Sequence, residues 1–284
     1  MRKHLKGFTA FFIVSLLLCL SAASPAADTV LAPGATSADV PILMYHGLTD
    51  RQDKVNEYFI PASTFRSDMK YLSDNGYTAI TMTQLINFVY DTGSGACLPE
   101  KPVIITFDDG YYNNHLFATP VLKEYGMKAV ISIVGSACQE ASEEEYMSDI
   151  YRNVTWTELS EMAESGQWEI QNHTWNMHKI DSSRKGARKN PGESTGEYAR
   201  LLKEDLLPLQ DKIKECTGRY PDTFTWPFGM YTPGSRDLLR SMGFKAGLIC
   251  ASGINHIEQG DKDAMFGLKR GLRTPDVSIE KLLR

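Results

Sequence analysis

Two adjacent carboxylates at the end of an apolar segment are the residues of this sequence best suited to do chemistry. Residues 103–107 are apolar and mostly β-branched, which predicts a buried strand, and Asp108, Asp109 and Gly110 follow it directly. Two neighbouring carboxylates repel each other unless a positive charge lies beside them. A bound divalent cation meets this need when one carboxylate ligates it and the other stays free as a base.

Two histidines in a later segment complete a candidate set of metal ligands. Residues 168–172 predict another strand, which leads into His173 and, five positions later, His178. Imidazole and carboxylate groups together are typical ligands of zinc and similar metals. An Asp-Asp-Gly sequence alone is typical of an ordinary turn. Beside the histidine pair, we interpret it as half of a metal site.

The elements that must position these residues alternate between strands and helices. Strands are predicted at 42–45, 103–107, 129–134, 168–172, 223–226 and 244–249, and helices at 61–75, 83–90, 113–125, 155–165, 195–216 and 235–242. Such alternation predicts a parallel sheet with helices outside it. No Gly-x-Gly-x-x-Gly or phosphate-loop pattern occurs, which weighs against a nucleotide-binding sheet. Because polar residues follow several strands, we expect a distorted (β/α) barrel with the site at its carboxyl-end face.

The N-terminus has the pattern of a secretory signal peptide, predicted over residues 1–27. A basic start is followed by a short apolar stretch at 8–20 and then by small residues. The alternative is an uncleaved anchor helix, but this stretch is shorter than the roughly 20 residues that span a bilayer. We therefore expect a secreted or cell-envelope protein, with a linker at 28–39 and one catalytic domain at 40–284.

Composition and charge limit the classes of partner. The 284 residues are 42% hydrophobic and 23% charged, which are ordinary values for a globular protein. Loss of the predicted signal peptide leaves 27 basic and 35 acidic residues, a net charge of −8, which argues against nucleic acid and anionic lipid surfaces. The polar segment 181–196 carries Arg184, Lys185, Arg188 and Lys189. We interpret it as a solvated loop, with a patch for an anionic polymer as the alternative.

Four cysteines remain after the predicted cleavage: Cys97, Cys138, Cys216 and Cys250. An even number in an exported chain permits up to two disulfides in three pairings, and spacing does not choose among them. Free buried thiols are the alternative for a domain of this size. Because no Cys-x-x-Cys pair occurs, a thiolate zinc site is not supported.

Residues 106–110 and 173–178 resemble the first two motifs of the polysaccharide deacetylases, the NodB-homology domain of carbohydrate esterase family 4. Residues 121–129 also resemble the segment that follows the first motif in that family, and residues 226–229 resemble its third motif. The resemblance extends from about residue 41 to the C-terminus. It implies a NodB-type barrel and a metal-dependent deacetylase.

The departures from the usual motifs point to one branch of the family. The two histidines are five residues apart instead of four, Thr225 stands where the third motif opens with Arg, and the late segment 268–270 lacks the usual Leu-x-His. Together with the early segment 41–46, these features are similar to the branch that deacetylates β-1,6-linked poly-N-acetylglucosamine. In that branch an N-terminal strand supplies the late histidine. The resemblance thus implies seven strands in a circularly permuted order.

The resemblance also implies roles for the candidate residues. Asp109, His173 and His178 would ligate a divalent metal, with Zn²⁺ expected, and Asp108 would be the general base. His46 is our prediction for the general acid. It ends an apolar strand that a parallel barrel would deliver to the face of Asp108, and the leaving amine needs a proton.

Further residues are predicted at the site with less direct support. By resemblance, the backbone N–H of Phe228 would hold the oxyanion. Arg270 or Arg273 would replace the missing arginine of the third motif. Trp175, which lies between the two ligand histidines, is expected to form a wall of the site, and Tyr111 is expected to stack on a sugar face.

These features predict an exported N-deacetylase that acts on an N-acetylglucosamine-containing polysaccharide. The enzymatic alternative is a deacetylase of peptidoglycan, chitin-type glycans or O-acetylated xylan, because the same chemistry serves amides and esters. The alternative from another class is a non-catalytic glycan-binding module that keeps the fold. The missing third-motif arginine is its only support. An acetylated amino-sugar polymer is the expected partner.

Overall fold

The computed structural model describes residues 35–93, 95–144 and 149–284. The predicted signal peptide and most of the predicted linker lie outside the described residues. The end of that linker does not, because β1 (Ser37–Val40) pairs antiparallel with β11 (Asn255–Glu258). The described fold thus begins before residue 40. Composition did not reveal this, because the partner strand lies more than 200 residues later in the chain.

The central strands are short and mostly buried: β2 (Ile42–Tyr45), β6 (Pro102–Phe107), β7 (Ala129–Ile133), β8 (Trp168–Asn172), β9 (Thr223–Thr225), β10 (Ala246–Leu248), β12 (Phe266–Leu268) and β13 (Gly271–Leu272). Three further strands lie beside them: β3 (Gly47–Thr49), β4 (Phe59–Pro61) and β5 (Thr78–Ala79). The helices are α1 (Ala62–Asp74), α2 (Met82–Tyr90), α3 (Tyr112–Glu124), α4 (Gly135–Glu143), α5 (Trp156–Glu164), α6 (Thr195–Thr217), α7 (Arg236–Ser241) and α8 (Ile279–Leu282). Short 3₁₀ turns occur at Gln52–Lys54 (η1) and Pro227–Gly229 (η2).

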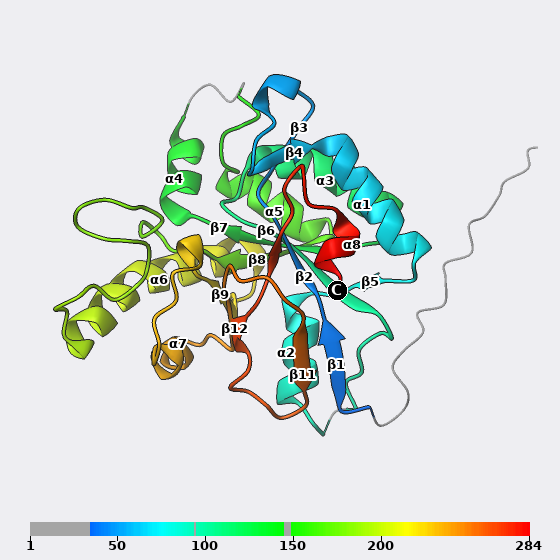
Figure 1. The fold of residues 1–284 in the computed structure, drawn as a ribbon. Coiled ribbons are helices and arrows are strands. Elements are labelled where there is room, and N and C mark those ends of the chain that lie inside the picture. The colour runs from blue at the N-terminus through cyan, green and yellow to red at the C-terminus, as the bar shows by residue number, and fades with distance from the viewer. Residues whose placement is uncertain (1–34, 94, 145–148) are drawn as a thin grey trace, which may run out of the picture.

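The parallel strands form a curled sheet that one late segment bridges (Figure 1). β10, β9, β8, β7, β6 and β2 are neighbours in that order. β12 pairs with β10 and β13 pairs with β2, and only Lys269 and Arg270 separate these two strands. The segment 266–272 therefore links the two edges and acts as the seventh strand of the described barrel. The predicted distorted barrel of parallel strands is confirmed.

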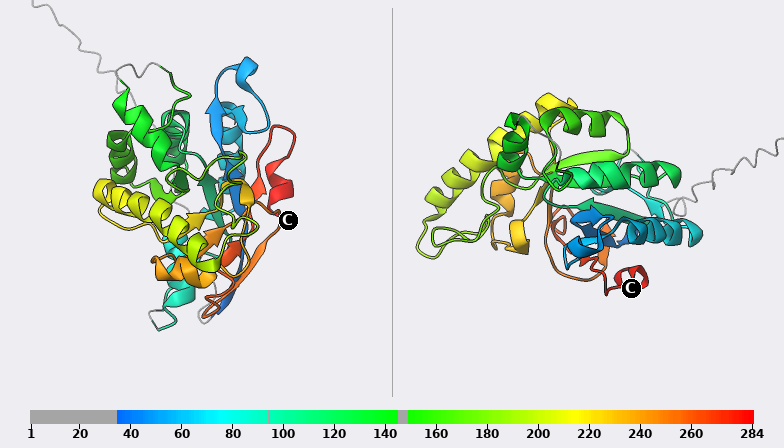
Figure 2. Two further views of the ribbon diagram at one scale, coloured as in Figure 1. Left: turned by 90° about the vertical axis from the view of Figure 1, so that its left-hand side faces the viewer. Right: turned by 90° about the horizontal axis from the view of Figure 1, so that it is seen from above.

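Side chains alternate between two hydrophobic clusters on the two faces of the sheet. Leu43, Ile105 and Ile131 belong to the cluster that contains buried residues of α1, α3 and α5. Ile42 and Ile104 belong to the other cluster, with residues of α2 and α7. Figure 2 shows the helices arranged around the strands. Each buried side chain of this kind contributes roughly 1.5–3 kcal/mol, so the two clusters together stabilise the packing of the helices on the sheet.

Local signals explain where the helices that flank β8 begin and end. Thr155 and Glu158 form a capping box at the start of α5, and Ser194 and Glu197 form another at the start of α6. α6 ends at Gly218, whose φ of 78° is a left-handed conformation that glycine adopts without strain. The end of α6 at Gly218 sets where the connection to β9 begins, and the third motif follows that strand.

Two further sequence questions have structural answers. Among the described residues, no helix is long and apolar enough to cross a bilayer. Cys97, Cys138, Cys216 and Cys250 are all free thiols, so the disulfide alternative is not realised in this structure.

Candidate active site

The first motif places its two carboxylates by an unusual backbone conformation at the end of β6. Asp109 has a φ of 68°, a left-handed conformation that costs a non-glycine residue about 1–2 kcal/mol. The turn is held from outside, because the Asn153 side-chain amide donates to the Asp109 carbonyl over 2.6 Å. Gly110 follows with a φ of 79°. The turn gives the two carboxylates different neighbours: Asp109 lies beside two histidines, and Asp108 lies against an arginine.

The second motif reaches the same place from the end of β8. His173 follows the strand, and Thr174 has a φ of 79°; its N–H donates to the Asn172 side-chain oxygen over 2.9 Å. The Asp205 carboxylate on α6 then accepts the N–H groups of Trp175 and Asn176 at 2.8 and 2.9 Å. These contacts shape the longer connection that brings His178 back beside His173, with ring centroids 4.8 Å apart.

Asp109, His173 and His178 form a cluster that fits a metal ion. One ligand atom from each residue lies within 4.8 Å of the other two. Asp109 Oδ1 is 3.6 Å from His173 Nε2 and 3.2 Å from His178 Nε2, yet it is buried and accepts no hydrogen bond. A cation among these three atoms would satisfy the unpaired carboxylate oxygen. The donor set of two imidazoles and one carboxylate is that of a zinc-type site with open positions.

Contacts behind the cluster orient its imidazoles. His173 Nδ1 lies 2.8 Å from the Thr225 carbonyl oxygen, which as an acceptor selects the tautomer that leaves Nε2 free to face Asp109. Burial, followed by the neighbouring His173, lowers the pKa of His178 to about 4. His178 is therefore neutral near pH 7, and a neutral imidazole nitrogen has the lone pair that a metal requires.

Asp108 is held by Arg270 in a fully buried, bidentate ion pair. Arg270 Nη1 donates to Asp108 Oδ1 over 2.6 Å and Nη2 donates to Oδ2 over 2.7 Å. The remaining donors of the guanidinium are also used, by the Ile249 carbonyl, Thr106 Oγ1 and Cys250 Sγ. Burial alone would raise the pKa of Asp108, but Arg270 outweighs burial and holds that pKa well below its usual value.

Arg273, the other candidate replacement for the third-motif arginine, lies in a different pair. Its Nε and Nη2 donate to Asp68 on α1 over 2.8 and 3.0 Å. The Tyr45 hydroxyl donates to the same carboxylate over 3.0 Å. Arg270 and not Arg273 therefore contacts the carboxylate of the first motif. The donor groups of Arg270 are all engaged inside the protein, so a role in binding substrate directly, also expected for a residue at this site, is not supported.

His46 stands beside Asp108 at the end of the adjacent strand. Tyr45 is paired with Phe107 in the β2–β6 register, and the Asp108 N–H donates to the Tyr45 carbonyl over 3.0 Å. His46 Nδ1 is buried without a hydrogen-bond partner in the described structure. Burial lowers the pKa of His46, while the charges of Asp108 and Asp109 act in the opposite direction. The imidazole thus lies within electrostatic range of both carboxylates.

Three other predicted site residues differ in their surroundings. Phe228 has a φ of 59°, and its ring lies 4.5 Å from that of His178 while 42% of the residue is exposed. Burial, followed by Asp109, raises the pKa of Tyr111 to about 12. Trp175 packs against Gly135 and stacks with Trp156 at 6.2 Å, contacts that belong to the hydrophobic core. Its expected role as a wall of the site stays a prediction.

Two other histidines, His115 and His256, lie away from the site. His256 lies in β11 and pairs with Asp39, which precedes β2. It is therefore at one end of the barrel, whereas His46, which follows β2, is at the other end. His115 contacts Thr119 on the same helix, α3.

Sequence reasoning missed three contacts at the site. Thr225 was counted as a loss because it is not arginine, yet its carbonyl orients His173. Asp205 shapes the second motif from α6, and the ring of Tyr58 lies edge-on to His46 at 4.9 Å. No local pattern identifies these contacts, because two of them involve backbone atoms and all three join distant segments.

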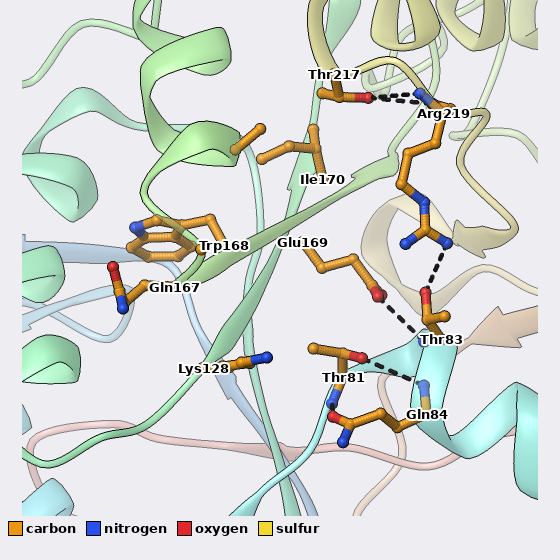
Figure 3. Close-up of a pocket in the computed structure, with 12 residues that line it drawn as sticks. Thr81, Thr83, Gln84, Lys128, Gln167, Trp168, Glu169, Ile170, Thr217 and Arg219 are labelled. Carbon is orange, nitrogen blue, oxygen red and sulfur yellow. Dashed lines mark hydrogen bonds between the residues drawn. The ribbon is translucent and has the colours of Figure 1, made fainter.

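A pocket of about 380 Å³ lies away from these residues, at the amino end of β8 (Figure 3). Two of the charged groups that line it, Glu169 and Arg219, form hydrogen bonds within the protein. Glu169 accepts the Thr83 N–H over 3.1 Å, and Arg219 donates to Thr83 Oγ1 over 2.8 Å. The amino ends of barrel strands usually serve stability, and the groups in this pocket fit that role.

Known proteins are similar to this chain in sequence and in fold. The Bacillus subtilis (strain 168) protein YxkH is 28% identical over 85% of this chain and 74% of its own length. The poly-beta-1,6-N-acetyl-D-glucosamine N-deacetylase of Escherichia coli (strain K12) is 24% identical over 77% of this chain, but the match spans only 35% of that enzyme. The structure of a de-N-acetylase from Aggregatibacter actinomycetemcomitans superposes with a TM-score of 0.70 at 25% identity, covering 86% of this chain and 98% of that one.

A family model described as polysaccharide deacetylase matches residues 95–247, just over half of the chain. This range contains the strands that carry the first, second and third motifs. The superposed de-N-acetylase extends the likeness to the strands on either side of it. The parallel barrel and the grouping of the motif residues at one end of it agree with the match, and the chain belongs to the polysaccharide deacetylase family.

Proposed function

We propose that this protein is a metal-dependent hydrolase that removes N-acetyl groups from an N-acetylglucosamine-containing polysaccharide. The observation that carries the proposal is the division of labour between adjacent carboxylates: Asp108 is locked to Arg270, and Asp109 faces two imidazoles. The names of the E. coli relative and of the superposed structure support an amide of an amino sugar as the bond that is cleaved. The acetate-release assay described below identifies the polymer that is cleaved.

Asp109, His173 and His178 would hold the metal, and their nitrogen and oxygen donors favour Zn²⁺. When bound, such an ion lowers the pKa of water and polarises the acetyl carbonyl. The protein prepares the ligands in advance, because the Thr225 carbonyl fixes the ring of His173 and the strained turn fixes Asp109.

Asp108 acts as the general base in this proposal. Arg270 keeps the carboxylate ionised and restricts it to one orientation, and Asp108 takes a proton from the water that attacks the acetyl carbon. Arg270 thereby performs, from the bridging segment of the barrel, the task that the third-motif arginine performs elsewhere in the family. If Arg270 takes over this task, the absence of the third-motif arginine no longer favours a non-catalytic glycan-binding module.

His46 acts as the general acid. Expulsion of the sugar amine requires a proton. His46 directly follows β2, at the same height in the sheet as Asp108 after the adjacent strand β6. The backbone N–H of Phe228 is the proposed oxyanion donor, and the exposed ring of Phe228 beside His178 limits the access of water.

We also infer that the protein acts outside the cytoplasm. The support is the signal-peptide pattern at residues 1–27. Its polymeric substrate would be met in the envelope or in the surrounding matrix.

Acetate release from N-acetylglucosamine oligosaccharides with β-1,6 or β-1,4 linkages tests the proposal. We expect release from at least one series and loss of that release in a chelator. Metal analysis of His173→Ala and His178→Ala should show loss of about one bound divalent ion per chain, with the folded wild type as the reference. Unchanged metal content in both variants would reject this ligand assignment.

A further inference from the structure

The connection between the second motif and α6 carries a net positive charge. We call residues 179–193 the basic loop; it contains five basic residues and only two acidic ones, in a chain whose net charge is −5. Among the described residues, only Arg184 of the five forms an ion pair, with Glu193. The other four basic side chains have no acidic partner within 4 Å in the described structure. Lys179, Lys185 and Arg188 are exposed, and Lys189 is partly buried.

The basic loop is anchored by its own contacts. The Gly186 N–H donates to the Lys179 carbonyl over 2.8 Å, and the Tyr198 hydroxyl donates to the Ala187 carbonyl over 3.0 Å. The Lys189 N–H donates to Thr232 Oγ1 over 2.9 Å. These contacts hold the backbone and involve none of the basic side chains. A loop that is only solvated needs no such anchoring. Because this backbone is anchored, each basic side chain extends from a fixed point on the surface.

The acidic groups in and near the basic loop form hydrogen bonds or ion pairs that do not involve its exposed basic side chains. Asp181 Oδ1 accepts the N–H groups of Ser183 and Arg184 at 2.7 and 3.0 Å. Glu193 pairs with Arg184 and also accepts the Asn190 N–H over 2.8 Å. Asp205 accepts the two N–H groups of the second motif. The basic loop keeps an excess of three positive charges, and the side chains of Lys179, Lys185 and Arg188 are exposed to solvent.

The basic loop borders the candidate active site. Lys179 directly follows His178, and the backbone of Gly186 packs against the third motif. A Cβ at residue 186 would lie 3.2 Å from the Pro227 carbonyl oxygen and 3.4 Å from the ring of Phe228, so the close approach depends on glycine. Figures 1 and 2 show the connection between β8 and α6 as a yellow-green loop that projects from the body of the molecule.

We propose that the basic loop binds carboxylate or phosphate groups that the glycan carries on or beside its N-acetylated sugars. The inference rests on the proposed function and names its substrate class as an anionic glycan. Charges within about one Debye length, roughly 8–10 Å, are only partly screened, so cations beside the site raise the local concentration of an anionic chain. Guanidinium and ammonium groups also form charge-assisted hydrogen bonds with both kinds of anion.

The test compares two N-acetylglucosamine oligosaccharides of equal length, one neutral and one with carboxylates beside the acetylated sugars. We expect wild-type kcat/KM to favour the anionic substrate by about ten-fold at low salt. The preference should vanish in the K185Q/R188Q variant, and for the wild type in about 0.3 M salt. The matched control is K123Q/K128Q. It removes the same charge from exposed lysines near the amino end of β7 and should keep the preference.

A second measurement separates this inference from the proposed function. Binding of carboxylated and of phosphorylated oligosaccharides without acetyl groups is followed by fluorescence anisotropy for the wild type and both variants. Loop-dependent binding to either oligosaccharide supports the inference and identifies the anion. This holds even if no substrate releases acetate, because that result would reject only the proposed function. Acetate release with equal kcat/KM on both substrates in all three proteins would overturn the inference alone. Loop-dependent binding to phosphatidylglycerol vesicles, with none to the glycans, would overturn it in favour of a lipid surface.

Discussion

Two buried arginine–aspartate pairs lie on either side of β13, and they differ in what surrounds them. Arg270 precedes the strand and holds Asp108 at the candidate active site. Arg273 follows the strand and holds Asp68 on α1. In both pairs two guanidinium nitrogens contact two carboxylate oxygens. One short segment thus delivers two arginines, one to the carboxyl end of β6 and one to a helix.

The two carboxylates respond differently to a similar partner. Burial disfavours the charged form of both groups. At Asp108, Arg270 together with the nearby His173 and His46 outweighs burial and lowers the pKa. At Asp68, burial outweighs Arg273 and raises the pKa. The surroundings of the two pairs also differ: His173 and His46 act to lower the pKa of Asp108, whereas Glu280 acts to raise the pKa of Asp68.

The largest effect should come from the carboxylate of the site. Asp108→Asn should reduce acetate release by about 1,000-fold or more, because an amide cannot accept the proton of the attacking water. The metal content should be unchanged, since Asp109 and not Asp108 lies in the ligand cluster. Activity and metal are measured on folded protein, with Asp68→Asn as the matched variant of the other pair. Loss of metal together with activity in Asp108→Asn would show that both carboxylates coordinate.

The next effect concerns the acid beside Asp108. His46→Ala should reduce hydrolysis of N-acetyl substrates by about 100-fold, within the usual range for a general acid. An ester with a good leaving group should lose much less, because that group departs without a proton. The control is His256→Ala, at the opposite end of the barrel. Equal losses on amide and ester would assign His46 a structural role instead.

Substitution of the two arginines should separate catalysis from stability. Arg270→Lys and Arg273→Lys keep the charge but lose the bidentate geometry, and breaking a buried pair typically costs about 3–5 kcal/mol, with Lys recovering part of it. Both variants should therefore unfold at lower urea concentrations. Only Arg270→Lys should reduce kcat of the folded protein, by about ten-fold, and move the acidic limb of its pH–rate profile upward. An equal loss of kcat in Arg273→Lys would break the distinction between the pairs.

The roles of these two arginines show where sequence reasoning stops. Asp108, Asp109, His173 and His178 were found because each follows a strand whose apolar pattern is visible in the sequence. The sequence named Arg270 and Arg273 as alternatives but could not separate them. Their positions depend on β12 and β13, which are too short for a periodic pattern and contain glycine. The contact between Arg270 and Asp108 joins residues 162 positions apart.

The basic loop illustrates a second limit. Its charges were visible in the sequence, and a solvated surface was the preferred interpretation. Whether a charged loop is free or engaged depends on which acidic groups it meets and on what its backbone contacts. Gly186 carries no chemistry of its own, yet its contact with Pro227 and Phe228 places the loop beside the site. Such information exists only in the folded chain.

The smallest effect should be a difference in how the two pairs respond to acid. The pKa of Asp68 is raised in the folded state, so above its ordinary value near 3.8 the folded protein holds a proton that the unfolded chain has lost. Stability relative to Asp68→Asn should therefore fall as the pH rises through this window. The pKa of Asp108 is lowered, so its contribution relative to Asp108→Asn should be complete above that ordinary value and disappear as the pH falls below it. Urea unfolding between about pH 2.5 and pH 6, with a chelator present so that metal release adds nothing, measures both differences. Slopes of the same sign for the two variants would mean that Asp68 and Asp108 are in equivalent environments, and the comparison between the pairs would fail.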